Sequence, residues 1–220
     1  MRATMHDAAD EVIVRSGRAE LSGVLHVPPG AAGVVAFAHG SGSSRHSPRN
    51  HRVATRLHDA GFATLLFDLL TEEEESDRRN VFDIDLLAQR LDDAWVMLAA
   101  DARSRSLPVG YFGASTGAAA AIVAAAGRPG VRAVVSRGGR PDLAGTALEG
   151  DLPPVLLIAG ERDEEVLSLN RHAALRIRGI VRLEVVAGAT HLFEEAGTLE
   201  RVADLAAAWF ARHVPTGATP

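Results

Sequence analysis

Short runs rich in valine, leucine and isoleucine recur along the chain and predict β-strands. Most of these runs are apolar at successive positions, a pattern typical of strands that are buried on both faces of a sheet. The predicted strands are Glu11–Arg15, Ala19–Val27, Gly33–Ala38, Phe62–Phe67, Leu107–Phe112, Val131–Ser136, Pro154–Ala159 and Val181–Val186.

Between the strands, apolar residues recur every three or four positions, which predicts helices. The longest helix is predicted from Asn80, as its N-cap, to about Ala100. The charged segment Thr71–Asn80 before it is interpreted as a solvated loop. The other helices are expected to begin near Pro48, Ser115, Pro141, Glu164 and Thr198.

Strands that alternate with helices predict an α/β protein with a mostly parallel sheet and helices on both faces. The first two strands have no helix between them, so we expect them to form an antiparallel pair at one edge. Residues 1–214 are interpreted as a single domain, and residues 215–220 as a disordered tail. In such sheets the functional site lies at the carboxyl ends of the strands, which directs attention to the residues after each strand.

Composition narrows the classes of function. The net charge of −5 argues against nucleic acid as a partner, because phosphate binding requires a basic face. The chain has no cysteine, which excludes disulfides, thiolate catalysis and cysteine-bound metals. The apolar run Ala118–Ala126 is too short to cross a membrane, and residues 1–10 lack the pattern of a secretory signal. We therefore expect a cytoplasmic protein with a small-molecule substrate, and the oligomeric state stays open.

A G-x-S-x-G sequence, Gly113–Gly117, follows the predicted strand Leu107–Phe112 and opens an alanine-rich helix. This context is that of a nucleophile elbow, in which a strained turn projects a serine hydroxyl above the sheet. Ser115 is therefore the candidate nucleophile. One alternative is a dinucleotide-binding turn, although its glycine spacing and its downstream acid are missing here. The other is a tight turn with an idle serine.

A serine hydroxyl becomes a good nucleophile only when a base removes its proton. His191 follows the last predicted strand, in a loop that can reach back to Ser115, and is the candidate base. The orienting acid is expected after the preceding strand, where several carboxylates crowd one turn. Asp163 is chosen because Glu164 and Glu165 are expected to begin a helix, where acids favour the positive end of the dipole. The resulting chain order of nucleophile, acid and base is that of α/β-hydrolases.

Acyl transfer also needs hydrogen-bond donors for the oxyanion that develops in the transition state. One donor is expected to be the backbone N–H of Thr116, directly after the nucleophile. The other is expected in the glycine-rich loop after Gly33–Ala38, where the N–H of Ser41 is preferred and that of Gly42 is the alternative. His39, which opens this loop, is expected to have a structural role.

Four segments, in this order, resemble the dienelactone hydrolase-like branch of the α/β-hydrolase superfamily: HGSGSS, GYFGASTG, LLIAGERDEEV and VVAGATHLFEEAG. The resemblance covers nearly the whole chain. It implies an eight-stranded sheet and ester hydrolysis through an acyl-enzyme, with no cofactor and no metal. Ser115 stands where dienelactone hydrolases carry cysteine, and Ala118 where they carry a second glycine. The segment Ser136–Pro153 is too short for a cap domain, so we expect an open site for small, soluble esters.

The sequence RGGR, which begins at Arg137, follows the strand Val131–Ser136 beside the predicted nucleophile strand. A guanidinium at this edge can bind a substrate carboxylate, so Arg137 is a candidate substrate-binding residue. The alternatives are an ion pair with Asp142 or Asp163, and exposure to solvent. The predicted activity is hydrolysis of small carboxylic esters. A thioesterase, a cofactor-free perhydrolase and a non-catalytic binding protein of the same fold are the alternative functions.

Overall fold

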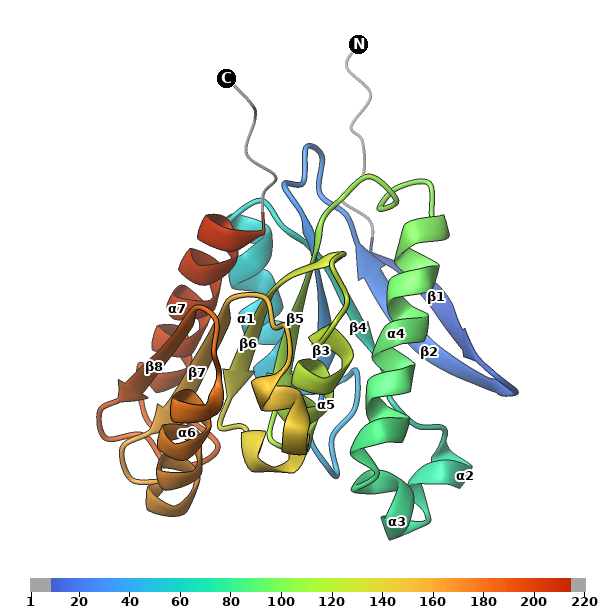
Figure 1. Cartoon of the computed structure of the whole chain (residues 1–220). Coiled ribbons are helices and arrows are strands. Elements are labelled where there is room, and N and C mark those ends of the chain that lie inside the picture. Colours follow the sequence, from blue (N-terminus) through green and yellow to red (C-terminus); the bar gives the residue numbers. More distant parts are fainter. Residues whose placement is uncertain (1–8, 215–220) are drawn as a thin grey trace.

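The structure is a computed structural model that describes residues 9–214. Figure 1 shows a central twisted sheet with helices packed on both of its faces. Residues 1–8 and the tail predicted at residues 215–220 lie outside the described residues.

Eight strands form one sheet. In the order of the sheet they are β1 (Ala9–Ser16), β2 (Ala19–His26), β4 (Ala63–Phe67), β3 (Val34–Ala38), β5 (Val109–Ala114), β6 (Val131–Arg137), β7 (Val155–Gly160) and β8 (Val181–Val186). β2 runs antiparallel to both β1 and β4, and every other neighbouring pair is parallel. The predicted mostly parallel sheet with an antiparallel first pair is therefore confirmed.

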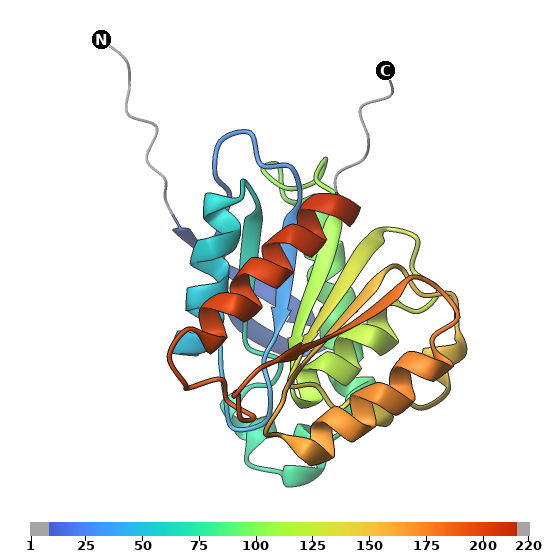
Figure 2. The same cartoon turned by 90° about the vertical axis from the view of Figure 1, so that its left-hand side faces the viewer.

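Helices cover the two faces of the sheet in separate layers. On one face α1 (Pro48–Asp59) and α7 (Thr198–His213) lie side by side (Figure 2). The other face is covered by α4 (Ile84–Ala100), α5 (Thr116–Ala125), the 3-10 helix η1 (Pro141–Glu149) and α6 (Glu164–Arg176). Each layer encloses its own hydrophobic core against the sheet. Within residues 9–214, no helix combines the length and the apolar character needed to span a bilayer.

The predicted start of the long helix α4 is wrong. The helix begins at Ile84 rather than after Asn80, because the Asp83 carboxylate accepts a hydrogen bond from the Leu86 N–H at 3.0 Å and caps it. The apolar stripe itself faces the core as predicted. Its buried members are Leu87, Leu91, Ala94 and Leu98.

The interpretation of Thr71–Asn80 as a loop is also wrong. The chain forms two one-turn helices here, α2 (Glu72–Glu75) and α3 (Arg78–Val81). α2 is stabilised by a capping box, in which the Thr71 hydroxyl accepts from the Glu74 N–H and the Glu74 carboxylate accepts from the Thr71 N–H. Both helices lie beside the carboxyl end of β4 (Figure 1).

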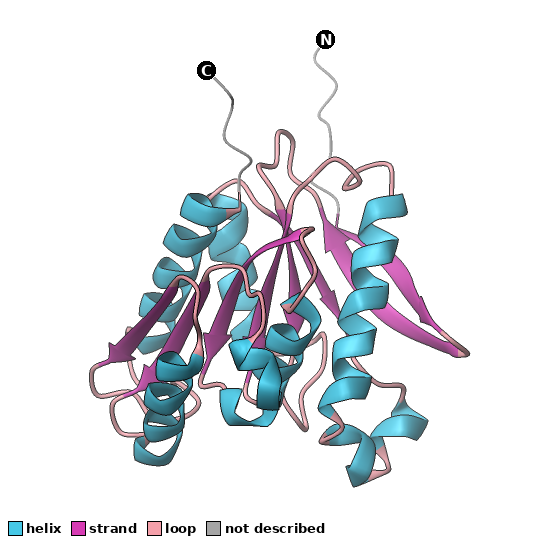
Figure 3. Ribbon diagram, in the orientation of Figure 1, coloured by secondary structure: helices cyan, strands magenta, loops and turns pink. Residues whose placement is uncertain are grey.

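The connection from β6 to β7 holds no inserted domain, as predicted. It consists of a short loop and η1, whose path bends at Gly145 with a φ of 55°. At the carboxyl ends of the strands, Figure 3 shows loops and helices and no separate domain. Among the described residues, no cap domain covers this edge of the sheet.

Candidate active site

The turn between β5 and α5 holds Ser115 in a strained backbone conformation. Its φ of 51° and ψ of −121° lie in a region that residues with a side chain rarely adopt. Strand and helix pack closely here, since a Cβ on Gly113 would lie 2.4 Å from Ala118 Cα. A Cβ on Gly117 would lie 2.3 Å from the carbonyl oxygen of Ala38. Glycine at these two positions therefore allows α5 to pack closely against β5 and β3.

Asp163 and His191 contact each other beyond the ends of β7 and β8. Asp163 Oδ2 lies 2.6 Å from His191 Nδ1, so the N–H on that ring nitrogen donates to the carboxylate. The Asp163 side chain is 14% exposed and the His191 side chain is 41% exposed. In a neutral imidazole this hydrogen bond selects the tautomer whose Nε2 is free to accept a proton.

The acids near Asp163 have different positions. Asp163 occupies the N-cap of α6 but makes no capping hydrogen bond, because its carboxylate is turned toward His191. Glu164 and Glu165 form the first turn of α6, as predicted, and are exposed. The Glu161 carboxylate accepts a hydrogen bond at 2.8 Å from the N–H of Gly188, in the loop after β8. Of this cluster, Asp163 is the acid that contacts the histidine.

The segment after β6 connects the serine with the histidine. The Ser115 N–H donates to the Arg137 carbonyl at 3.3 Å, and the Ser115 carbonyl accepts from the Arg140 N–H at 3.1 Å. A Cβ placed on Gly138 would lie 3.1 Å from the His191 carbonyl oxygen and 3.6 Å from His191 Cε1. The structure thus brings the serine, the histidine and its carboxylate partner to one edge of the sheet.

The loop that carries His191 is held by contacts that the sequence analysis missed. The Thr190 hydroxyl and the Thr190 N–H donate to the two Glu195 carboxylate oxygens, at 2.7 and 3.1 Å. These hydrogen bonds lower the pKa of the Glu195 carboxyl below its ordinary value. Phe193, with a φ of 55°, is buried beneath the loop. No local pattern distinguishes Glu195 from the adjacent Glu194, since the shape of the loop decides which one meets Thr190.

His39 anchors the loop after β3, consistent with the expected structural role. Its Nδ1–H donates to the Gly40 carbonyl at 3.0 Å, and its Nε2 accepts from the Leu69 N–H at 3.0 Å. Burial lowers the pKa of His39 below the ordinary value of 6.5, which favours the neutral ring that these bonds require. The next residue packs on the candidate nucleophile, since a Cβ on Gly40 would lie 3.0 Å from Ser115 Cβ.

A second contact ties the same loop to the end of β4. The Arg45 N–H donates to Asp68 Oδ1 at 2.7 Å, and the Arg45 guanidinium forms an ion pair with the same carboxylate. The loop is therefore held at both ends, by His39 and by Arg45.

The two predicted oxyanion donors lie next to each other. The Ser41 N–H donates to Thr116 Oγ1 at 3.1 Å. Thr116 is the first residue of α5, and backbone N–H groups in a first turn have no partner within their helix. The bond from Ser41 to the threonine hydroxyl was not foreseen from the sequence, because it joins residues far apart in the chain.

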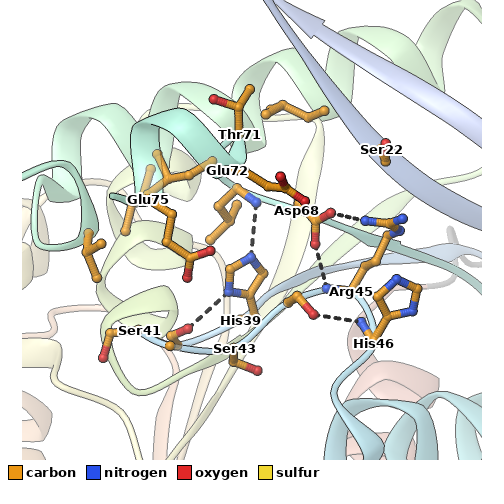
Figure 4. A pocket seen from close by; sticks show the side chains of 18 of the residues that line it. Ser22, His39, Ser41, Ser43, Arg45, His46, Asp68, Thr71, Glu72 and Glu75 are labelled. Atoms are coloured by element: carbon orange, nitrogen blue, oxygen red, sulfur yellow. Dashed lines mark hydrogen bonds and ion pairs between the residues drawn. The ribbon is translucent and has the colours of Figure 1, made fainter. Parts of the chain in front are cut away.

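A cavity of about 470 Å³ opens beside this loop. Figure 4 shows its walls, which come from the loop after β3, the ends of β2 and β4, and helix α2. The cavity reaches Ser41 and Thr116 on the side of the candidate nucleophile. Thr71, Glu72 and Glu75 also line it, so the segment interpreted as a solvated loop is part of the cavity wall.

Arg137 ends β6 with its side chain buried, at 8% exposure. In the described part of the chain no acid pairs with it, since Arg140 pairs with Asp142 at 2.8 Å and the Asp163 carboxylate faces the histidine. The predicted alternatives of an ion pair with Asp142 or Asp163, and of exposure to solvent, are therefore wrong. Burial, and to a smaller extent the charge of Arg49, lower the pKa of the Arg137 guanidinium to about 10, so it stays charged at neutral pH.

Comparison with known proteins agrees with this fold. A family model described as an alpha/beta hydrolase domain matches residues 31–213. A dienelactone hydrolase from Anabaena variabilis, known from a crystal structure, is 51% identical, with a TM-score of 0.92 over 95% of this chain and 100% of that chain. The esterase domain of a Rhodothermus marinus protein is 18% identical, with a TM-score of 0.76 over 94% of this chain and 99% of that chain. The last likeness concerns the fold alone.

Two proteins of Mycobacterium tuberculosis, from strains CDC 1551 and H37Rv, are 62% identical to the chain over 206 residues. Their names assign them provisionally as phosphoribosyl transferases. The match covers 93% of this chain but 46% of each relative, so the chain spans about half the length of the curated relatives it matches.

Proposed function

The chain belongs to the α/β-hydrolase family, with a dienelactone hydrolase-like fold, and we propose that it is a serine hydrolase of small carboxylic esters. The observation that carries this proposal is the strained Ser115 at the same edge of the sheet as the Asp163–His191 pair. Ser115 is the proposed nucleophile, His191 the general base and Asp163 the orienting acid. A protein that only binds a ligand has no need of a histidine held by a carboxylate beside such a serine.

In the first step of the proposed mechanism, Ser115 Oγ attacks the ester carbonyl while His191 Nε2 takes the hydroxyl proton. The Asp163 carboxylate orients the imidazole and stabilises the imidazolium that forms. The tetrahedral intermediate then loses its alcohol as the C–O bond breaks, and His191 returns its proton to the departing oxygen. The products of this step are the free alcohol and Ser115 carrying the acyl group.

In the second step, water replaces the alcohol. His191 Nε2 takes a proton from the water as the water oxygen attacks the acyl carbonyl. The new intermediate releases Ser115 Oγ, which receives the proton from His191, and the carboxylic acid leaves. Both steps use the same side chains in the same positions.

The proposed donors to the oxyanion are the backbone N–H groups of Thr116 and Ser41, with Gly42 as the alternative to Ser41. Thr116 heads α5, so the positive end of the helix dipole also favours negative charge there. In the free protein the Ser41 N–H is bonded to Thr116 Oγ1. We propose that, when the oxyanion forms, the Ser41 N–H donates a bifurcated hydrogen bond to this hydroxyl and to the substrate oxygen.

We expect Thr116→Val to lower kcat about 10- to 100-fold with little change in KM, because the Ser41 amide loses the acceptor that positions it. Valine keeps the volume of threonine, which confines the change to the hydroxyl. Thr116→Ser retains an acceptor and is the matched control, with an expected kcat close to that of the wild type. Steady-state kinetics on one p-nitrophenyl ester compare the three proteins. Equal kcat values for wild type and Thr116→Val would mean that this hydrogen bond does not position the Ser41 amide for catalysis.

We propose that the cavity beside Ser41 and Thr116 receives the acyl or the alcohol group of the substrate. Its volume of about 470 Å³ is within the range of small-molecule sites. Its wall combines glutamates and hydroxyls with leucines and a valine, which suits a short group with both polar and apolar parts better than a long hydrocarbon chain. The substrate that fits best is therefore a small ester.

The name of the curated relatives refers to proteins more than twice as long as the matched segment. We infer that any transferase activity belongs to the part of those relatives that this chain does not match, because the matched part is the alpha/beta hydrolase domain. On this proposal the relatives join two activities in one chain.

The proposed function is tested with p-nitrophenyl esters of graded acyl length and with thioesters of the same acyl groups. We expect the short acyl esters to be hydrolysed fastest, since the cavity of about 470 Å³ has polar groups in its wall that disfavour a long hydrocarbon chain. Preference for thioesters would favour a thioesterase, and peracid formation from acetate and hydrogen peroxide would favour a perhydrolase. No turnover of any ester, together with no labelling of Ser115 by a fluorophosphonate, would contradict the proposal and favour a binding protein.

A further inference from the structure

Arg90 is a buried arginine of α4 that lies behind the wall of the cavity. Its side chain is 6% exposed. It follows Leu87, which lines the cavity, by about one turn of α4, but it is not itself a lining residue. Because a guanidinium stays charged in a protein, a buried arginine requires acceptors close by.

Two walls of the cavity provide the acceptors for Arg90. Its Nη2 donates to Glu74 Oε1 of α2 at 2.6 Å, and its Nη1 donates to the carbonyl oxygen of Ser16, at the end of β1, at 3.0 Å. The cavity is lined on one side by α2 with its N-cap, and on another by the start of β2, which follows Ser16 after a tight turn (Figure 4). The lining residues from these two segments are Thr71, Glu72 and Glu75, and Glu20, Leu21 and Ser22. One guanidinium therefore joins two walls of the cavity from behind.

The Glu74 carboxylate carries this link into the backbone of α2. Its Oε2 accepts from the Thr71 N–H at 2.9 Å, while Oε1 accepts from Arg90. In α3, Asn80 Nδ2 donates to the Glu74 carbonyl at 2.9 Å. A helix of a single turn is not stable by itself, so the position of α2 depends on such contacts.

The other end of the link has a second attachment. The Ser16 hydroxyl donates to Asp93, which lies three residues after Arg90 on α4. The end of β1 therefore keeps a contact with α4 when Arg90 is removed. Of the two walls, α2 is the one that we expect to move.

We propose that Arg90 is a positioning residue that holds α2 in the wall of the cavity and thereby limits the length of the group that the cavity accepts. This deepens the proposed hydrolase function and rests on it, because it takes the cavity as the place of the acyl or the alcohol group. Arg90 contacts α2 and β1 rather than the proposed catalytic residues, so its effect is on which ester binds. When the link is lost, the cavity of about 470 Å³ widens and takes a longer group.

The first test measures length selectivity in Arg90→Met, which keeps an apolar stem and removes the charge. Two ratios of kcat/KM are compared with those of the wild type: p-nitrophenyl hexanoate over acetate, and hexyl acetate over methyl acetate. We expect one of them to rise about 5- to 20-fold, mainly through a lower KM for the longer ester. The ratio that rises identifies whether the acyl or the alcohol group occupies the cavity.

A pair of further variants separates selectivity from stability. Glutamine has one oxygen for the two donors that Glu74 accepts from, so Glu74→Gln should raise the same ratio. It should also lower the Tm by about 3–8 °C, because the buried guanidinium loses its carboxylate. Arg90→Met combined with Glu74→Gln should regain part of the Tm and keep the raised ratio. A ratio that returned to the wild-type value in the double variant would follow stability alone and contradict the positioning role.

A second test needs no hydrolysis. Arg78 and Arg79 are exposed in α3, and cleavage by trypsin after either of them requires local opening of this segment. We expect Arg90→Met to accelerate this cleavage about 10-fold or more, with the site identified by mass spectrometry. Arg176→Gln is the matched control and should be cleaved here at the wild-type rate, because it removes only an exposed ion pair with Glu149.

The two tests distinguish the failure of this proposal from the failure of the hydrolase function. Faster cleavage in Arg90→Met, with no hydrolysis of any ester by the wild type, would support the hold of Arg90 on α2 and contradict the hydrolase. Hydrolysis with both ratios unchanged in Arg90→Met and in Glu74→Gln would overturn the role of Arg90 in selectivity, whatever the rate of cleavage.

Discussion

Replacing Ser115 with alanine should abolish ester hydrolysis, with kcat lower by about 10⁴-fold or more. The reason is that the variant lacks the hydroxyl of the strained residue between β5 and α5, with which the proposed attack on the carbonyl begins. Alanine has a Cβ like serine, so the turn and the packing of α5 are expected to survive. Steady-state kinetics and thermal unfolding of the variant measure these two expectations separately.

A fluorophosphonate probe gives an independent readout of the same residue. It should label Ser115 in the wild type, as identified by mass spectrometry, and should not label Ser115→Ala. Ser43→Ala is the matched control, because Ser43 lines the cavity beside the same loop but has no proposed part in the chemistry. Labelling at another serine, with turnover retained in Ser115→Ala, would refute the assignment of the nucleophile.

Asp163→Asn should lower kcat about 10³- to 10⁴-fold with little change in the fold. An asparagine side chain can donate to His191 Nδ1, which would favour the tautomer whose Nε2 carries a proton and cannot accept one from Ser115. It also removes the negative charge that stabilises the imidazolium. The measurement is kcat on a p-nitrophenyl ester, with the Tm of the variant as the check on folding.

Two neighbouring carboxylates provide the controls for Asp163. Glu164→Gln and Glu165→Gln should retain most of the activity, because both residues lie exposed in the first turn of α6. Their negative charges interact favourably with the helix dipole, and at exposed positions this contributes little to stability. A large loss in Glu164→Gln combined with a small loss in Asp163→Asn would transfer the orienting role to the glutamate.

The alternation of strands and helices could be predicted from the sequence because it depends on near neighbours. Apolar runs such as Gly33–Ala38 and Pro154–Ala159 are typical of strands that are buried on both faces of a sheet. The elbow around Ser115 was predictable for the same reason, since its strand, its turn and its helix are consecutive. A Cβ added at Gly113 or Gly117 would lie within 3 Å of backbone atoms, so a side chain at either position would clash. A local sequence therefore determined both the fold class and the place of the candidate nucleophile.

Helix boundaries were predicted less well, because several polar residues compete for each cap. Asn80 and Asp83 both suit an N-cap, but Asn80 lies within α3, and Asp83 is the residue whose carboxylate accepts from an N–H in the first turn of α4. The many charged residues of Thr71–Asn80 suggested a loop exposed to solvent. Thr71 and Glu74 instead cap a turn of helix that closes one side of the cavity.

Tertiary structure alone decided which side chains meet. The sequence placed His191 and several acids after neighbouring strands and favoured Asp163 among them, but the contact itself joins residues 28 positions apart that meet only in the folded chain. The sequence likewise offered Asp142 and Asp163 as partners for Arg137. In the folded chain both acids have other partners, and Arg137 is buried without one. Periodicity is a property of residues a few positions apart. These contacts join segments that only the assembled sheet brings together, so the hydrophobic pattern cannot show them.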